Sequence, residues 1–529
     1  MNNSRKTLLL TGFIFLIFFI PRVISLGQSM VSDGGARFWQ PRSREFRQAV
    51  LEGDWESTYR KYHPGVTVMW LSGFSEHLFE KAAEFKLGRN LRNEPRYEPY
   101  RQIALKLPLV FVISAVAAFC FYLLRSVVDT GFAFLALLFL CLEPFFLGIS
   151  RYVHVSALVG ILPFAVLVAA YLYLKKGEWV YLILAGAFFG LSVMTKIVGV
   201  VAGVSVFVLF LILRKFWEHF KNKDFWKQYI LEMLVFGGIA LLVFFLCFPA
   251  VWMDVIGVCR RIINEGAMGV AFRGIRPDMI VDSDFTYYLE IFIFRSTPVA
   301  VFFFFLSFYY LLSAKESEEK RFSLAALIFY AVTWFALSYP SKLKDRYLVD
   351  LYPYTSVLSA YGVWELTKNC GKKLKVVLGC VAVLFYGSIF VRYHPEYSFY
   401  YNDALGGAAG REELGLSVKN RGEYYAQVAT YLNSSAPEPE ICNKNAVVLD
   451  RERIPSFKNH FMGKTFSDPS NMPDGYHAHY FVTDARYISQ VPETCSLIKE
   501  FGPRFYPRHT ALYVYDCGKS IDNTYDTSN

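Results

Sequence analysis

Charged residues are scarce in this chain: Asp, Glu, Lys and Arg make up 19% of it, whereas 54% of its residues are hydrophobic. So apolar a composition over 529 residues excludes a single soluble globular protein. The chain also lacks an internal repeat at a fixed period, which weakly disfavours transporters built from inverted repeats. No cysteine or histidine spacing resembles a zinc site, so the sequence predicts no metal site.

What the chain does contain is a series of long apolar runs. Runs of about 17 to 23 residues, the length that a membrane-spanning helix needs, recur from Thr7 to Val391 and then stop. About eleven of them can be counted. They cover residues 7–26, 103–124, 131–149, 155–174, 179–195, 197–213, 229–251, 287–313, 323–339, 347–366 and 375–391. The sequence therefore predicts an all-α polytopic membrane protein with about eleven transmembrane helices.

The short loops between the runs predict the orientation of the chain. Segments rich in Lys and Arg, such as "RKFWEHFKNKDFWK" and "KNCGKKLK", fall on alternate sides of successive runs and are placed together in the cytoplasm. Residues 27–101 and everything after Arg392 then lie on the extracytoplasmic face. We predict a multi-pass protein of the cell (inner) membrane that contacts membrane lipids. The net charge of +10 comes mostly from the basic loops, so no nucleic-acid partner is expected.

The pattern divides the chain into a membrane core, residues 1–391, and an outer domain, residues 392–529. Within the core, the first outer loop (27–101) contains two stretches with helical spacing, "SREFRQAVLEGDW" and "VTVMWLSGFSEHLFEKAAEF", expected to be surface helices. Strand-like runs such as "NAVVLD", "AHYFVTD" and "ALYVYDC" predict that the outer domain is α/β. Two of its three cysteines, Cys442, Cys495 and Cys517, could pair in an oxidising compartment, and the sequence does not say which.

Several charged residues stand at the outer ends of the apolar runs, where a charge is costly. Asp33 follows the first run, Glu143 lies near the end of the third, and Lys196 interrupts an otherwise apolar stretch. The other members of this set are Arg151, His154, Lys342, Lys344, Asp345 and Arg346. Several cations with one or two carboxylates at this depth indicate a site for an anionic lipid headgroup with a base nearby.

Each of these residues also has a purely structural explanation. Helix capping is the alternative for Arg151 and His154, and Glu143 could be a carboxylate at a helix end that faces water. Snorkelling to the membrane interface is the alternative for Lys342, Lys344 and Arg346. An aspartate beside two glycines, as Asp33 is, most often belongs to a turn. Lys196 is harder to explain without a function, because a turn between two short spans offers few reasons for a lysine.

Five stretches, read together and in order, resemble a known family. They are "VSDGGARFW", "YHPGVTVMWL", "LEPFFLGISRYVHVSAL", "AGAFFGLSVMTKIVG" and "KLKDRYLVDLYPYTSVLSAYG", and "HPEYSFYYNDALGG" at the start of the outer domain adds to them. The arrangement is similar to that of the membrane glycosyltransferases of family 39 type, which include protein O-mannosyltransferases and lipid A aminoarabinose transferases.

The resemblance implies a C-type glycosyltransferase fold and a mannosyltransferase-like reaction. The donor would be a polyprenyl-phosphate monosaccharide (dolichyl- or undecaprenyl-phosphate), and the acceptor a protein, lipid or glycan outside the cell. No cofactor is required, and a bound divalent cation is left open.

The resemblance also assigns roles to single residues. Asp33 corresponds to the family's first-loop acid and would act as general base on the acceptor hydroxyl. Glu143 corresponds to the acid before proline at the end of the third span and is the second catalytic candidate. Lys196, the lysine of the "TK" turn, would contact the donor phosphate. Arg151, Lys342 and Arg346 are the candidate helpers in phosphate binding, and His63 and His154 the supporting residues.

Two other classes of protein remain as alternatives. A secondary transporter or lipid flippase would also hold charges at membrane depth, although paired repeats would be expected of it. A non-catalytic membrane scaffold would leave Asp33 and Lys196 without a purpose. The alternatives differ from the enzyme in one respect that a structure can examine, namely whether the charged residues face a common site.

Overall fold

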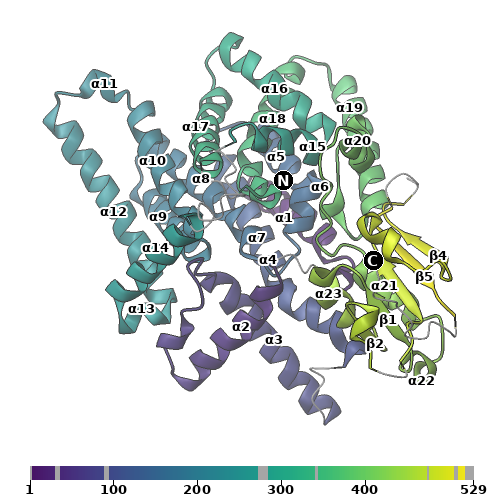
Figure 1. The fold of residues 1–529 in the computed structure, drawn as a ribbon. Coiled ribbons are helices and arrows are strands. Elements are labelled where there is room, and N and C mark those ends of the chain that lie inside the picture. Colours follow the sequence, from purple (N-terminus) through teal and green to yellow (C-terminus); the bar gives the residue numbers. More distant parts are fainter. Residues whose placement is uncertain are drawn as a thin grey trace.

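The computed structural model describes residues 3–29, 36–88, 94–271, 284–339, 343–473, 476–504 and 510–518. Most of them are helical, and a small sheet forms near the C-terminus (Figure 1). The bundle consists of α1 (Asn3–Val23), α4 (Glu98–Leu124), α5 (Thr130–Leu142), α6 (Pro144–Ile149), α7 (Val155–Val159), α8 (Leu162–Lys176), α9 (Trp179–Thr195), α10 (Val200–Leu213), α12 (Lys223–Cys247), α15 (Tyr287–Arg295), α16 (Pro298–Ser313), α17 (Glu318–Ser338), α18 (Tyr352–Thr367) and α19 (Lys372–Tyr393). Shorter helices α11 (Phe216–His219) and α13 (Pro249–Met253) and the longer α14 (Val255–Ala271) connect them.

Helices that are apolar on all sides occupy the middle of the bundle. Nearly every residue of α8 is buried, because α4, α9, α10 and α17 surround it. The first eleven residues of α18 are buried in the same way, against α5, α16 and α17. A helix without a polar face is stable only when it is enclosed, so α8 and α18 form the centre around which the others pack.

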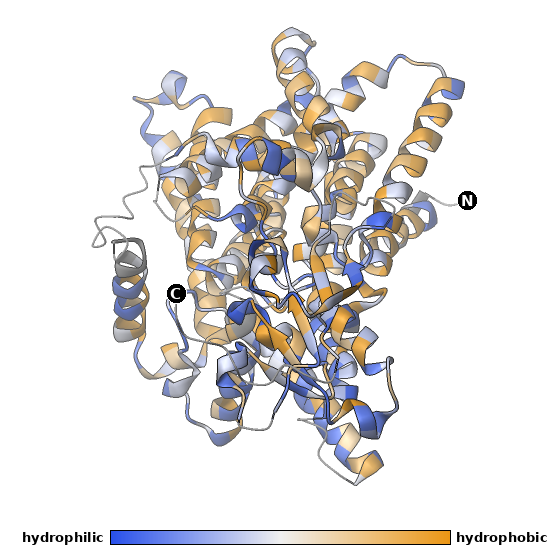
Figure 2. Cartoon of the chain, turned by 45° about the vertical axis from the view of Figure 1, so that its right-hand side comes forward, coloured by the Kyte–Doolittle hydropathy of each residue, from blue (hydrophilic) through white to orange (hydrophobic). Residues whose placement is uncertain are grey.

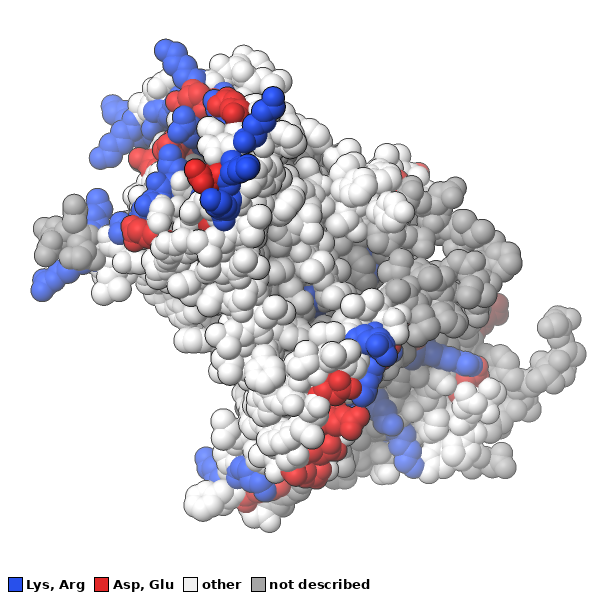
Figure 3. Space-filling view, turned by 90° about the vertical axis from the view of Figure 1, so that its left-hand side faces the viewer, with Lys and Arg blue, Asp and Glu red and all other residues white. Residues whose placement is uncertain are grey.

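The outer surface of the bundle is apolar in a broad belt. Figure 2 shows hydrophobic residues dominating the long helices, and in Figure 3 the charged residues gather toward two ends with an uncharged zone between them. On α12, Leu234 and Leu241 are 67% and 71% exposed. Exposed leucines at such a density are expected where lipid, and not water, is the solvent.

Each of the eleven predicted runs contains at least one helix. Among the described residues, five helices are long and apolar enough to cross a membrane, within Arg5–Gln28, Pro95–Leu124, Lys223–Cys247, Glu318–Ser338 and Lys372–Tyr393. Several others are shorter apolar helices of 10 to 17 residues. A mostly helical protein with several apolar helices and a small sheet domain is thus confirmed, while the count of eleven spans stays a prediction.

Small residues set the distance between α9 and α12. A Cβ on Gly186 would lie 2.6 Å from the Phe236 carbonyl oxygen, and one on Gly190 would lie 2.6 Å from that of Ala240. These glycines, four residues apart, let the two backbones touch, as small residues commonly do between membrane helices. The close contact fixes the end of α9, where Lys196 follows.

The two helices predicted in the first loop are confirmed as α2 (Ala36–Glu52) and α3 (Val66–Leu87), which pack side by side. Arg44 of α2 forms an ion pair of 2.9 Å with the buried Glu76 of α3. Gly73 of α3 lies where a Cβ would be 2.4 Å from the Ser43 carbonyl oxygen. The first loop is therefore a packed helical hairpin.

The outer domain contains a five-stranded sheet in the order β2-β1-β3-β5-β4. Its strands are β1 (Asn445–Val448), β2 (Lys464–Phe466), β3 (Tyr480–Thr483), β4 (Ser496–Phe501) and β5 (Leu512–Asp516). β1 is parallel to β2 and β3, whereas β5 is antiparallel to β3 and β4. Its helices are α20 (Gly407–Glu413), α21 (Tyr425–Asn433), α22 (Glu438–Ile441) and α23 (Ile454–Lys458). The predicted strands are β1, β3 and β5, while the two edge strands were not identified.

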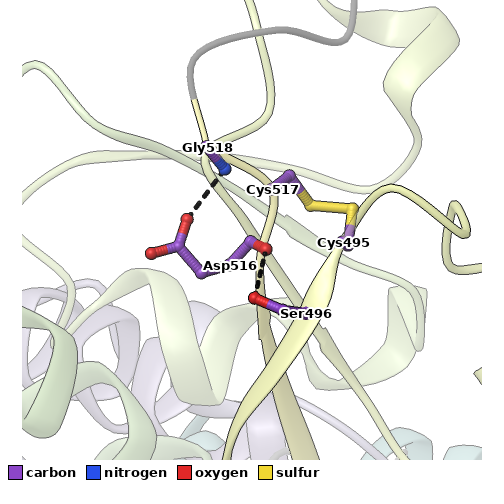
Figure 4. The surroundings of a disulfide bond; sticks show 5 residues. All are labelled: Cys495, Ser496, Asp516, Cys517 and Gly518. Atoms are coloured by element: carbon purple, nitrogen blue, oxygen red, sulfur yellow. Dashed lines mark hydrogen bonds between the residues drawn. A yellow bond between two sulfur atoms is a disulfide. The ribbon is translucent and has the colours of Figure 1, made fainter.

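A disulfide joins Cys495, next to β4, to Cys517, next to β5 (Figure 4). Gly518 N–H donates to an Asp516 carboxylate oxygen at 2.9 Å beside it, which closes the turn after β5. Cys442, the remaining cysteine of the three, is an exposed free thiol. The structure thus selects one of the pairings that the sequence left open.

Removal of this disulfide should destabilise the outer domain. The bond spans 22 residues. A crosslink of that span lowers the conformational entropy of the unfolded chain and so stabilises the folded domain by about 3 kcal/mol. We expect the double substitution Cys495→Ser/Cys517→Ser to lower the melting temperature, measured in detergent, and Cys442→Ser to leave it unchanged. Labelling of all three cysteines by a thiol reagent in the native, unreduced protein would contradict the assignment.

Candidate active site

Lys196 occupies the turn between α9 and α10, immediately after the last residue of α9. Its side chain is 2% exposed, and its Nζ lies 3.1 Å from Oδ2 of Asp350, whose side chain is 5% exposed. Asp350 ends the 3-10 helix η7 (Asp345–Asp350) and directly precedes α18. The cation thus stands at a helix C-terminus and the anion near a helix N-terminus, and both positions are favoured by the helix dipoles.

An aromatic ring brings a second predicted cation to Lys196. Lys196 Nζ is 4.2 Å from the ring centroid of Tyr347, and the Arg346 guanidinium carbon is 5.8 Å from the same centroid. The two residues are 150 positions apart in the sequence. The structure therefore joins Lys196 and Arg346, both predicted to bind the donor phosphate, in one site.

The first loop reaches this site at its "YHPG" segment. Gly65 N–H donates to the carbonyl of Thr195 at 3.1 Å, and the hydroxyls of Thr67 and Thr195 are 2.7 Å apart. His63 therefore lies two residues from a contact with the residue before Lys196, and its ring packs on Tyr62 with centroids 4.2 Å apart.

Gly65 cannot be replaced by a residue with a side chain unless the backbone or Trp39 moves. Its φ of +64° favours glycine, and a Cβ there would lie 1.8 Å from the Trp39 ring. Trp39 also contacts His154, whose ring centroid is 6.4 Å away in an edge-on arrangement. His154 Nδ1 accepts a hydrogen bond from Ser156 N–H at 3.0 Å, so His154 caps the N-terminus of α7. Trp39 thus links the predicted supporting residue His154 to the "YHPG" segment.

Asp33 and Lys342 lie outside the described residues, so their predicted roles stay predictions. The last described residue before Asp33 is Ser29, whose hydroxyl donates to the buried Glu396 carboxylate at 2.9 Å. The Lys106 ammonium donates to the carbonyls of Ser29 and Leu26, the latter at 3.3 Å. The chain that leads to Asp33 is therefore held by an acid from the outer domain and a lysine from α4.

η7 is fixed at its other end by a buried charge triad. Asp345 forms ion pairs with Arg295 of α15, at 3.1 Å, and with Arg421 of the outer domain. All three side chains are at most 5% exposed. Burial disfavours ionisation of Asp345, but Arg421 and Arg295 outweigh burial and hold the pKa of its carboxyl well below its usual range. The Asp345 carboxyl therefore stays ionised, and the triad ties the bundle, η7 and the outer domain together.

Glu143 is engaged in the bundle by Thr297. Its two carboxylate oxygens accept from Thr297, at 3.1 Å from the backbone N–H and 2.6 Å from the hydroxyl. Thr297 caps the start of α16. These contacts favour a role for Glu143 in placing α16 over a role in proton transfer.

Arg151 is likewise engaged by backbone. It donates to the carbonyls of Pro395 at 2.6 Å and Ile24 at 2.8 Å, and its guanidinium lies 5.3 Å from the Tyr397 ring centroid. The residue joins the end of span one to the beginning of the outer domain. Its contacts favour positioning of these two segments over direct phosphate binding.

Sequence reasoning missed three buried charges that the structure places at or near the site: Lys106, Asp350 and Glu396. Asp350 and Lys106 each lie near an end of a predicted span, where a charged side chain is costly and usually has an oppositely charged or hydrogen-bonding partner. Glu396 gave no such signal, because "HPEYS" lies in a polar segment.

Substitution of Asp345 should destabilise the protein as a whole. Asp345→Asn would leave Arg295 and Arg421 buried without a counter-charge, and loss of one partner of a buried ion pair costs about 3–5 kcal/mol. We expect a large fall in melting temperature in detergent. Asp224→Asn, which removes the partner of the exposed Lys227, should have little effect. Equal melting temperatures for both variants would contradict a central role of the triad.

Glu396 should make stability depend on pH. Burial raises the pKa of its carboxyl to about 7, although hydrogen bonds from Gln427 and Ser29 oppose that rise. The pKa of this carboxyl in the unfolded chain is near 4.5. Between pH 4.5 and about 7 the folded state therefore binds more protons than the unfolded state does, and the free energy of unfolding falls as pH rises through this window. The loss totals about 3 kcal/mol and ends near pH 7. Melting temperatures of Glu396→Gln and wild type should therefore diverge with rising pH, and a pH-independent difference would refute the shift.

Among the described residues, no three His, Cys, Asp or Glu side chains gather in a way that could hold a metal ion.

Residues 101–249 match the family model described as dolichyl-phosphate-mannose-protein mannosyltransferase. A comparison with curated proteins finds no match.

Solved structures resemble the whole chain. ArnT from Cupriavidus metallidurans bound to undecaprenyl phosphate is 15% identical, with a TM-score of 0.50 over 98% of this chain and 99% of that one. The apo state of the same ArnT gives 14% identity and a TM-score of 0.49, over 97% and 98% of the two chains. The archaeal oligosaccharyltransferase AglB from Archaeoglobus fulgidus, in complex with an inhibitory peptide and a dolichol-phosphate, gives 13% and 0.44, over 90% and 70%. The resemblance to the family 39-type membrane glycosyltransferases is thus confirmed, by the family match over residues 101–249 and by a fold shared with ArnT over nearly the whole length.

Proposed function

We propose that the chain transfers one monosaccharide from a polyprenyl-phosphate donor to an acceptor on the extracytoplasmic face of the membrane. One observation carries the proposal: Lys196 and Arg346 lie over the Tyr347 ring, beside the point where the first loop docks on Thr195. Three segments far apart in the sequence meet there. A cationic site of this kind suits the phosphate of a lipid donor.

The proposed reaction exchanges one bond for another. The acceptor hydroxyl oxygen bonds to the anomeric carbon while the bond from that carbon to the donor phosphate oxygen breaks. Asp33 takes the proton of the hydroxyl as general base. The polyprenyl phosphate leaves with the bonding electrons, and Lys196 and Arg346 stabilise the negative charge, with Lys342 as a third cation. Fixed cations supply this stabilisation in the proposal, so it includes no metal ion.

The other predicted residues have positioning roles in the proposal. Glu143 places the start of α16 through Thr297, and Arg151 holds the end of span one against the outer domain. His154 supports the first loop through Trp39, which packs against Gly65, and His63 does so from the same "YHPG" segment as Gly65.

The extracytoplasmic location has two supports. The basic loops predict that residues 27–101 and the outer domain share that face. The Cys495–Cys517 disulfide fits an oxidising compartment, because such bonds are rare where thiols are kept reduced.

Loss of Lys196 should abolish transfer. The assay uses purified protein in detergent with radiolabelled polyprenyl-phosphate mannose, the donor that the family match suggests first, and then glucose and aminoarabinose donors, each with host membrane fractions as acceptor. Lys196→Met removes the charge that meets the leaving phosphate, and we expect the transfer rate to fall by a factor of about 100 or more. Asp33→Asn should lower the rate by a similar factor through loss of the base.

The matched control is Lys215→Met, since the Lys215 side chain is 61% exposed in the loop after α10. It should transfer at the wild-type rate. Detergent micelles have no second compartment, so a transporter would form no labelled product at all. Wild-type protein that forms none with any donor would revive the transporter and scaffold alternatives, and full activity of Lys196→Met would remove Lys196 from the mechanism.

A further inference from the structure

A cleft of about 790 Å³ separates the first loop from the outer domain. One wall is built by α2 and the beginning of α4, and the other by α23 and β2, which face each other in Figure 1. The lining includes Gln40, Arg44, Glu98 and Arg101 on the first wall and Lys458 and Thr465 on the second. None of these residues belongs to the Lys196 site.

The second wall ends in the edge of a sheet. β2 is the edge strand of the described sheet and pairs on one side only, with β1. Lys464 N–H donates to the Lys444 carbonyl at 3.0 Å, so the backbone polar groups of Lys464 point to β1. Backbone groups alternate sides along a strand, so the N–H and C=O of Thr465 point away from β1. Because Thr465 lines the cleft, these groups can pair with an extended chain lying there.

The charges of the two walls are not balanced. On the first wall, Arg44 pairs with Glu76 at 2.9 Å, Arg101 with Glu98 at 2.5 Å, and Glu94 with Arg96 at 3.1 Å. On the second wall, no carboxylate of the described residues forms an ion pair with Lys458 or Lys464. The strand edge therefore carries the surplus positive charge of the cleft, which suits an acidic occupant.

The cleft is connected to the active site through α2. Trp39 packs on Gly65 and His154, and the next residue of the same helix, Gln40, lines the cleft. Gln40 also pairs with Gln102 of α4 at 3.3 Å, which fixes this end of α2. An occupant of the cleft would therefore lie against the helix that follows the Asp33 segment.

We propose that the cleft docks an extended, acidic segment of an acceptor polypeptide, which adds to the sheet as a strand beside β2. The inference rests on the proposed function, because it assigns the acceptor side of that reaction. Main-chain hydrogen bonds to Thr465 supply affinity without a fixed sequence, and Lys458 and Lys464 favour acidic side chains. A phosphorylated lipid would satisfy the lysines but would leave the strand edge unused, so the peptide is favoured.

Proline at the strand edge tests the mode of binding. Thr465→Pro removes the outward N–H, and an edge strand tolerates proline at such a position. The control is Ile498→Pro, at the bulge of β4 on the opposite edge of the same sheet. Two quantities are measured for each variant: binding of the radiolabelled polyprenyl-phosphate sugar that is active in the assay above, and label transferred to protease-sensitive material in host membrane fractions.

We expect Thr465→Pro to bind the donor as wild type does but to lower protein labelling at least tenfold, and Ile498→Pro to change neither. Lys458→Glu should lower protein labelling severalfold, again without an effect on donor binding. Wild-type labelling by Thr465→Pro would overturn the docking site, as would a wild-type product that resists protease and extracts with lipid. Failure of the wild type to bind any donor would instead refute the proposed function and, with it, this inference.

Discussion

The buried Asp345 carboxylate, with an arginine on either side, is the interaction on which the site depends. A buried guanidinium without a counter-charge is too costly to persist, so Arg295 of α15 and Arg421 of the outer domain are both held to one point at the start of η7. Five residues further along, η7 presents Asp350 to Lys196. The triad thereby fixes both the docking of the outer domain and the position of the phosphate-binding candidates.

The Lys196–Asp350 pair gives a buried lysine a counter-charge inside an apolar bundle. Burying an unpaired charge is costly, and the Asp350 carboxylate at 3.1 Å offsets part of that cost. In the proposed mechanism, the three N–H donors of the ammonium let a phosphate join Asp350 at Lys196 without displacing it. Two anions would then share one cation, and Arg346, on the same tyrosine ring, supplies the second positive charge that such an arrangement needs.

The parts of the fold that the sequence predicted are those set by local periodicity. The apolar runs, the surface helices α2 and α3, and strands β1, β3 and β5 each carry their own pattern of spacing. β2 was missed because three residues, Lys464–Phe466, are too few to show alternation, and β4 because all but its last residue are exposed. Of the candidate site, Lys196 and Arg346 were found from charge at membrane depth and from family resemblance. Asp350 and Glu396 became visible only as tertiary partners, since no local pattern encodes a contact across 154 or 367 residues.

The outer domain is part of the candidate site, because its residues contact three segments of the bundle that surround the site. Arg421 reaches Asp345, Glu396 binds Ser29 before the Asp33 segment, and the carbonyl of Pro395 accepts from Arg151. All three contacts are made by buried polar groups, whose loss would leave unsatisfied donors or charges in the bundle. Movement of the outer domain would therefore disturb the segment that leads to Asp33, the Lys196 site and the cleft beside α2 at once. In the proposed mechanism, the domain must therefore dock before the active site is complete, and an acceptor bound between this domain and α2 would hold the assembled site in place.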